Sequence, residues 1–302
     1  AFAFSSYFFI IIQAGHMTKA HAIAYVPMVV AAVLYTYRGK MLLGGVLTSL
    51  TVALEIYANH LQITYYLFLI LCLIGFVQFL KDFRDNNLLS FSKRTVILLL
   101  AALLASGTSL TRLVTTMEYG QESTRGQSEL TANMDNKTSG LDKDYATQWS
   151  YGIAETLTLL IPNFHGGASQ GELTIESETY QAIKRSPNAK KLIKSLPLYW
   201  GSQPLVNGPT YAGSIVIFLF FLGLFFIRSE IRIWIILATI MSIMLAWGKN
   251  FMGLTEFFLD YFPGYNKFRA VSMILVIVEF TLPLLGFIAL DSFLKSDKSV
   301  FA

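Results

Sequence analysis

Apolar residues occur in long blocks along this chain, and polar residues gather in the gaps between the blocks. Stretches such as 70–77, 96–105 and 214–227 contain no charged residue. A helix needs ~20 mostly apolar residues to cross a bilayer. The pattern predicts eight helical segments that span or nearly span a membrane, at 2–14, 20–37, 41–58, 62–80, 94–112, 211–227, 231–247 and 268–290. Pro27 and Pro283 lie inside two of these segments and predict kinks, which neighbouring membrane helices can accommodate.

The composition supports this interpretation. Of the 302 residues, 54% are hydrophobic and 14% are charged, whereas an ordinary soluble domain carries roughly 25% charged residues. The mean hydropathy is +0.53. These values exclude a soluble globular protein, a disordered chain and a nucleic-acid-binding domain. Cys72 is the single cysteine, so one chain can form neither a disulfide nor a cysteine-based zinc site.

Lysine and arginine are distributed unevenly over the short loops. If the eight segments alternate, ten of these residues fall on one side: Arg38, Lys40, Lys81, Arg84, Lys93, Arg94, Arg228, Arg232, Lys295 and Lys298. The short loops of the other side hold Lys19, Lys249, Lys267 and Arg269. Because cytoplasmic loops are enriched in lysine and arginine, the first set is predicted to be cytoplasmic. This topology also accounts for the basic pI of about 9.0.

The topology divides the chain into three parts. Residues 1–114 form a block of five helical segments, 115–209 form an extracytoplasmic insertion, and 210–302 form a block of three helices. The insertion carries 10 of the 19 acids and 8 of the 23 bases, and long loops cross the membrane largely regardless of charge. Within it we expect irregular chain over 118–145, an interfacial or re-entrant helix near 155–161, and a small surface helix over 176–196.

The chain begins inside an apolar segment, with no polar leader. We therefore expect it to be part of a longer membrane protein.

Polar residues with chemical potential gather on the predicted outer side. All four histidines, His16, His21, His60 and His165, fall there. We expect one cavity at this membrane boundary in which His16, Lys19, Glu55, His60, Gln62, Glu155 and Arg269 approach one another. For each aromatic or basic residue the simpler alternative is an interfacial anchor, and for each histidine it is a hydrogen-bonded surface group. The sequence contains no motif for a metal, although a divalent metal stays an open alternative.

Glu279 is the exception, because it lies ten residues beyond Arg269 in an apolar run, about 15 Å deeper at 1.5 Å per residue. A carboxyl group near the middle of a membrane must face the bundle, be protonated or be paired. A proton or ion relay is one interpretation. A neutral hydrogen bond between helices is the favoured one, since the other segments supply few charges.

The outer motifs resemble those of the YfhO family of bacterial membrane proteins, most closely its Bacteroidetes-type members. The motifs are Gly15-His16-x-x-Lys19-Ala20, Asn59-His60-x-Gln62, Trp149-Ser150 followed by Glu155, Leu160-Ile161-Pro162-Asn163-Phe164-x-Gly166-Gly167, Tyr199-Trp200-Gly201, Gly208-Pro209-x-Tyr211-x-Gly213, and Pro263-x-Tyr265-Asn266-Lys267-Phe268-Arg269. The resemblance covers nearly the whole chain. It implies an all-α polytopic fold of the GT-C glycosyltransferase type, in the bacterial cytoplasmic (inner) membrane.

The resemblance also implies an activity. Such enzymes take a sugar from a polyprenyl-phosphate carrier at the outer face of the membrane and transfer it to a cell-envelope glycan or lipid. Arg269 and Lys267 are expected to hold the phosphate with Lys19, His16 and His60, and Trp149, Tyr199 and Trp200 to stack on a sugar; Glu55, Gln62 and His165 complete the predicted substrate-binding set. The family's main carboxylate is expected upstream of residue 1. Glu155 is the best acid or base in this chain, by elimination.

Two other functions stay open from the sequence. A transporter or flippase for a lipid-linked sugar would use the same outer cations, but it also needs a polar path through the membrane. A non-catalytic scaffold in envelope assembly would need only the helices and the long insertion. In each case the lipid bilayer is a partner and nucleic acid is not.

Overall fold

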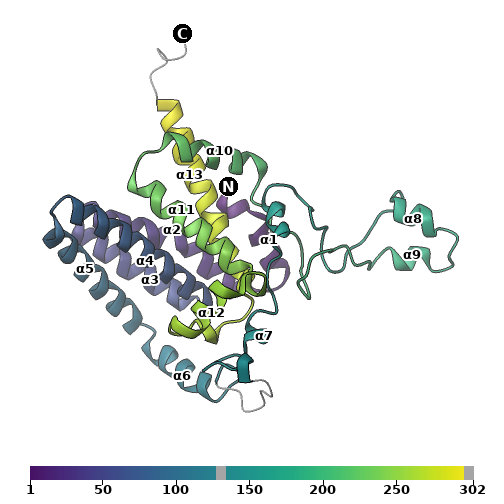
Figure 1. Ribbon diagram of the computed structural model, residues 1–302, viewed down its shortest axis with the longest axis horizontal. Helices are drawn as coiled ribbons and strands as arrows, with labels where there is room; N and C mark the ends of the chain where they lie inside the picture. Colours follow the sequence, from purple (N-terminus) through teal and green to yellow (C-terminus); the bar gives the residue numbers. More distant parts are fainter. Residues whose placement is uncertain (127–133, 296–302) are drawn as a thin grey trace, which may run out of the picture.

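The computed structural model describes residues 1–126 and 134–295, and the regular structure in these ranges is helical, with no sheet. The α-helices are α1 Ser6–Gln13, α2 Met17–Tyr37, α3 Met41–Tyr57, α4 Leu61–Arg84, α5 Leu88–Gly107, α6 Leu110–Gln121, α7 Lys143–Ala146, α8 Glu178–Ile183, α9 Ala189–Leu192, α10 Ser214–Phe226, α11 Glu230–Ala246, α12 Met252–Tyr261 and α13 Leu275–Lys295. The 3-10 helices are η1 Phe2–Phe4, η2 Met134–Asn136, η3 Ala154–Leu159, η4 Gly248–Phe251, η5 Tyr265–Lys267 and η6 Val271–Ile274. Figure 1 shows the long helices in one bundle, from which α8 and α9 project on an arm.

Four of the described helices are long and apolar enough to cross a membrane: α2, α4, α5, and η6 continued by α13. A fifth span is obtained if α11 is counted together with η4 and α12, which follow it after a bend of 112°. α3 has 17 residues, α10 has 13 and α1 has 8. All eight predicted segments therefore contain helix, but only four or five reach spanning length. Pro27 and Pro283 lie inside continuous helices.

The segment predicted at 94–112 differs most from the observed structure. α5 begins six residues earlier and ends at Gly107, and α6 starts after a break. At the break, the Thr108 hydroxyl donates to the carbonyl of Ala105 at 2.7 Å. Such local bonds compete with the helical hydrogen-bond ladder. α6 then extends the bundle beyond α5, at the lower end of Figure 1.

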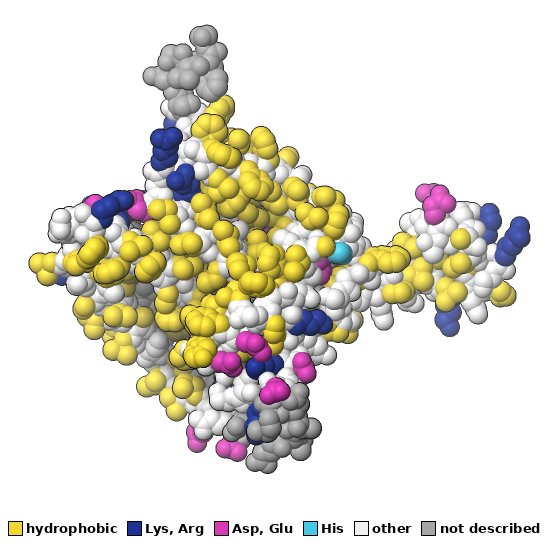
Figure 2. Space-filling model, in the orientation of Figure 1, with side chains coloured by type: hydrophobic (Ala, Val, Ile, Leu, Met, Phe, Trp, Pro, Cys, Tyr) yellow, Lys and Arg dark blue, Asp and Glu magenta, His cyan; other side chains and the backbone are white. Residues whose placement is uncertain are grey.

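α13 is the best-buried long helix, because 72% of its most apolar window is enclosed by the bundle. Two glycines allow α10 to pack closely against it. A Cβ atom on Gly223 of α10 would lie 2.7 Å from Leu285 Cγ, and one on Gly286 of α13 would lie 3.1 Å from Leu219 Cβ. Small residues at helix contacts are typical of membrane bundles. In the orientation of Figure 1, apolar side chains cover the middle of the bundle (Figure 2). Charged side chains lie on the arm with α8 and α9, at the lower end of the molecule and at its upper left.

The ends of the helices form two chemically different layers. We call the end where α2 and α4 finish and where α5 and α11 begin the inner end, and the opposite end of the bundle the outer end. At the inner end, Arg38, Lys81, Arg94 and Glu230 line one cavity of about 520 Å³. Three of the bases predicted to be cytoplasmic, Arg38, Lys81 and Arg94, thus share one end of the bundle, whereas Lys298 lies outside the described residues.

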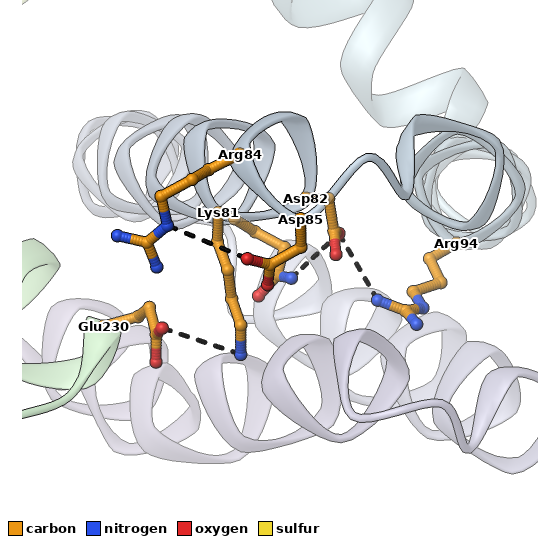
Figure 3. A network of polar contacts seen from close by, with 7 residues as sticks. Lys81, Asp82, Arg84, Asp85, Arg94 and Glu230 are labelled. Atoms are coloured by element: carbon orange, nitrogen blue, oxygen red, sulfur yellow. Dashed lines mark hydrogen bonds and ion pairs between the residues drawn. The ribbon is translucent and has the colours of Figure 1, made fainter.

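Ion pairs hold the inner end together, as Figure 3 shows. Lys81 Nζ of α4 lies 3.6 Å from Glu230 Oε1 of α11. Arg94 Nη1 of α5 lies 3.4 Å from Oδ2 of Asp82, which is buried on α4 and also accepts a 2.9 Å hydrogen bond from Gln78. These contacts join α4 to α5, which follows it in the sequence, and to the distant α11.

The insertion consists of short elements. The expected helix near 155–161 is the 3-10 helix η3, and the expected surface helix over 176–196 is the pair α8 and α9. The two chain segments that lead to this pair are joined by an isolated antiparallel bridge, with backbone hydrogen bonds of 2.9 and 3.0 Å between Gly171 and Leu196. The stretch expected to be irregular, 118–145, instead includes the end of α6, the 3-10 helix η2 and the start of α7, and its residues 127–133 lie outside the described ones.

The predicted sidedness can be tested by cysteine labelling in intact cells. Two single-cysteine variants are made in a Cys72→Ser background. Ser139→Cys places the thiol on an exposed residue of the insertion, and Asn86→Cys places it on an exposed residue of the inner end. A membrane-impermeant maleimide should label position 139 and leave position 86 unlabelled until the cells are opened. The reverse pattern would contradict the assignment of the inner end to the cytoplasm.

Candidate functional site

A cavity of about 1040 Å³ opens at the outer end of the bundle. Ten of the twelve candidate residues line it: His16, Lys19, His60, Gln62, Trp149, Glu155, His165, Tyr199, Lys267 and Arg269. They come from the starts of α2 and α4, from the insertion, and from the turn between α12 and η6. The structure therefore brings together residues that lie up to 253 positions apart in the sequence.

Glu55 and Trp200 do not line the cavity, although the sequence suggested both. Glu55 is fully buried against α4, where its Oε1 accepts a 3.0 Å hydrogen bond from the Thr64 hydroxyl. Trp200 is 81% exposed on the arm, next to the lining residue Tyr199. Both differences have one cause. The sequence shows that a residue lies near the outer boundary, but it does not show in which direction the side chain points.

Residues 147–156 are fastened to the outer end of α11, and we call this contact the seam. The backbone N–H of Tyr151 donates to the carbonyl of Ala246 at 2.8 Å. The Ser150 hydroxyl donates to the carbonyl of Thr147 at 2.6 Å and accepts from the backbone N–H of Lys249 at 2.8 Å. The seam thus fixes the part of the insertion that carries the cavity residues 149, 151 and 155.

Glu155 is buried, and three donors occupy its carboxylate. Oε1 accepts from the Tyr199 hydroxyl at 2.9 Å and from Gln203 Nε2 at 3.1 Å. Oε2 accepts from the backbone N–H of Gly152 at 3.0 Å. Gln203 Oε1 in turn accepts from the Ser272 hydroxyl at 3.0 Å, which ties this network to η6. Since buried carboxylates need such partners, Glu155 positions the groups around it.

Burial, and more weakly the nearby Glu155 carboxylate, raise the pKa of Tyr199 to about 12. Its hydroxyl therefore keeps its proton at neutral pH and serves as a donor.

Arg269 lies at the exposed rim of the cavity. Its Nη1 donates to the Tyr145 hydroxyl at 2.6 Å, and its guanidinium carbon lies 5.6 Å from the Tyr145 ring centroid and 5.5 Å from that of Trp149. The backbone carbonyl of Arg269 accepts a 2.6 Å hydrogen bond from Gln62 Nε2 at the start of α4. The Arg269 guanidinium is therefore held by one hydrogen bond and two aromatic rings, and several of its five N–H donors remain available for a ligand.

Lys19 is 8% exposed, yet it makes no hydrogen bond or ion pair with any residue in 1–126 or 134–295. Burial, and then the charge of Lys19, lower the pKa of His16. Burial is also the main reason that the pKa of His60 is lowered to about 4, and Lys19, His16 and Arg125 lower it further. Both histidines are therefore held in the neutral form, next to the positive charge of Lys19.

His60 has a defined tautomer as a result. Its Nδ1 accepts from the backbone N–H of Ile63 at 3.4 Å and so caps α4. A neutral histidine with an accepting Nδ1 carries its proton on Nε2. That N–H is a second kind of donor for an anion.

Several lining residues were not among the sequence candidates. Tyr151, Gln203, Arg125 and Tyr65 line the cavity, and Tyr145 holds Arg269. Only the turn motifs that flank the candidates pointed to this region. Among the described residues, no group of three or more His, Cys, Asp or Glu side chains could hold a metal ion.

The lowered pKa of His60 predicts that the free energy of unfolding of the chain falls in acid. Because its folded pKa is about 4 and its ordinary value is about 6.5, the unfolded chain binds more protons between these values. Stability from this residue is present above pH 6.5 and is lost as the pH falls towards 4, by at most about 3 kcal/mol. Thermal unfolding of the purified chain in detergent would measure the effect.

The variant for this test is His60→Asn, which keeps a capping acceptor but does not titrate. It should flatten the unfolding temperature between pH 6.5 and 4, whereas His21→Asn, at an exposed histidine, should not. An unchanged acid loss in His60→Asn would show that His60 is not the responsible group.

The comparisons with known proteins add no assignment: no family model, no curated protein and no solved structure matches this chain.

Proposed function

We propose that the outer cavity binds the phosphate of a polyprenyl-phosphate-linked sugar, and that the chain is a GT-C-like membrane glycosyltransferase of the YfhO type, acting at the outer face of the cytoplasmic membrane on a cell-envelope acceptor. The observation that carries the proposal is Lys19. This side chain is mostly buried, and its ammonium group borders the cavity without an ion-pair partner among the described residues, so an anion in the cavity would be stabilised beside it. The cavity beside it, of about 1040 Å³, has room for a sugar phosphate.

The other donors around the cavity suit the same ligand. Arg269 can offer parallel N–H groups to a phosphate, whereas Lys19 acts as a point charge. The Nε2–H of His60 adds a neutral donor, and Lys267 and Arg125 line the same space. Glycosyl transfer from a phosphate carrier develops negative charge on the leaving phosphate, and donors fixed before the reaction stabilise that charge.

Aromatic side chains could receive the sugar. Trp149, Tyr199 and Tyr65 line the cavity. The Glu155 network keeps Tyr199 in place, and the seam and Arg269 keep Trp149 in place. In this proposal Glu155 orients the sugar-binding groups, because its oxygens already accept three hydrogen bonds and are poorly placed to take a proton from an acceptor.

The lipid part of the ligand has a route along α6. Leu110, Val114 and Met117 lie at helical spacing on one face of α6 and are 58%, 52% and 71% exposed. Met117 and the neighbouring Thr116 also line the cavity. An amphipathic helix of this kind lies in the membrane interface. It would let a polyprenyl chain stay in the bilayer while the phosphate enters the cavity.

Arg269 gives the test of this function. Arg269→Ala should reduce transfer of labelled sugar from polyprenyl phosphate in membranes by roughly 10- to 150-fold, because hydrogen bonds to charged groups contribute about 1.5–3 kcal/mol. Arg269→Lys should fall between this variant and the wild type, since it keeps the charge and loses the paired donors.

The control is Lys249→Ala, which removes an exposed base outside the cavity and should leave transfer unchanged. Each substitution is made in the full-length protein, and the variants are compared at equal expression. Wild-type transfer by Arg269→Ala would leave Arg269 only the role of an interfacial anchor.

A further inference from the structure

Glu279 is a buried carboxyl group that the proposed function does not use. It lies in α13 and is 1% exposed. Neither of its carboxyl oxygens has a hydrogen-bond partner within the described ranges. The sequence favoured a hydrogen bond between helices for this residue, and the structure contains no such bond there.

Three residues with hydroxyl groups, Ser5, Tyr7 and Tyr151, interact electrostatically with Glu279. The Ser5 hydroxyl is close enough to interact with the carboxyl, but both groups lack a hydrogen bond of acceptable geometry. The Tyr151 hydroxyl is itself buried without a partner among the described residues.

Two of these hydroxyl-bearing residues also border the outer cavity. Tyr7, Tyr151 and Leu275 all line that cavity. Glu279 follows Leu275 by four residues on α13, which is one helical turn, or about 6 Å at 1.5 Å per residue. The carboxyl group therefore lies just beneath the cavity floor.

Among the described residues, no charged side chain of the elements packed on α13 pairs with Glu279, and η1 and η6, which also pack there, have none. α10 contains no charged residue. The two charged residues of α11, Glu230 and Arg232, lie in its first turn at the inner end, where Glu230 pairs with Lys81 and Arg232 donates to the carbonyl of Leu224. Asp291 and Lys295 of α13 pair with each other towards that same end. A buried carboxylate without a cation or donors is strongly disfavoured, so this site favours the protonated acid.

We propose that Glu279 is a proton-binding site that exchanges its proton with the outer cavity through the hydroxyls of Tyr7 and Tyr151. In loading, a proton from water in the cavity passes along a hydroxyl to the carboxylate, which becomes a neutral carboxylic acid. In unloading, the proton returns and the cavity floor gains one negative charge. The site thus couples the charge beneath the cavity to the pH of the solution that fills it.

Dicyclohexylcarbodiimide tests this assignment, because this apolar reagent modifies protonated carboxyl groups in membranes. The full chain is placed in oriented vesicles, treated at different pH values on each side, and analysed by peptide mass spectrometry. Glu279 should be modified, and its modification should fall about tenfold per pH unit above the half-point when the cavity-side pH is raised. Sodium ions should have no effect.

Three results would overturn the assignment: no modification of Glu279 at any pH, modification that follows the pH of the inner end, or protection by sodium, which would make the site a cation site. Glu279→Gln must abolish the signal at this position. Glu55→Gln, which removes the buried carboxyl of α3, should leave modification of Glu279 unchanged.

A second variant tests the route. Tyr151→Phe should slow the response of modification to a cavity-side pH jump by about tenfold, without abolishing it. An unchanged rate in both Tyr151→Phe and Tyr7→Phe would rule out the hydroxyl route.

Discussion

The seam between the insertion and α11 is the contact on which the outer end depends. Ser150 fits against Gly248, where the backbone has a φ of 48° and a Cβ atom would lie 2.1 Å from the Ser150 hydroxyl oxygen. Only glycine tolerates both conditions at once. The contact continues where Trp247 Nε1 donates to the Thr156 hydroxyl at 2.8 Å and Asn250 Nδ2 donates to the carbonyl of Tyr151 at 2.9 Å. These bonds hold residues 147–156 of the insertion against the outer end of α11, next to the cavity.

The two ends of the bundle use charge in opposite ways. At the inner end, Lys81 and Arg94 are matched by Glu230 and Asp82, so the ion pairs hold α4, α5 and α11 together. At the outer end, Lys19 faces a cavity without a carboxylate partner among the described residues. Paired charges stabilise an arrangement of helices, whereas clustered charges of one sign repel each other and are retained where a ligand neutralises them. This asymmetry is the main physical reason to place a ligand site at the outer end.

The sequence predicted the helices better than their lengths. Long apolar blocks locate membrane helices because a backbone in lipid must satisfy its own hydrogen bonds. The break at Thr108, where the hydroxyl bonds to the carbonyl of Ala105, lies inside a stretch predicted as one helix, and nothing in the hydrophobic pattern marks it. The layer of the candidate residues also followed from the alternation of segments, and ten of the twelve meet in one cavity. The direction of a side chain did not follow, so Glu55 and Trp200 were misplaced. Tyr145 was missed because its contact with Arg269 depends on the fold of the insertion.

The central claim is that the outer cavity selects a phosphate on a lipid, and a binding titration tests it most directly. The purified full-length protein is titrated with polyprenyl phosphate and, separately, with the corresponding polyprenol, while tryptophan fluorescence is recorded and Trp149→Phe identifies the signal from the cavity. The account predicts a saturable change with the phosphate, none with the alcohol, and binding weakened at least tenfold in Lys19→Met, which keeps the length of the side chain and removes its charge. Equal binding of both lipids, or wild-type affinity in Lys19→Met, would contradict it.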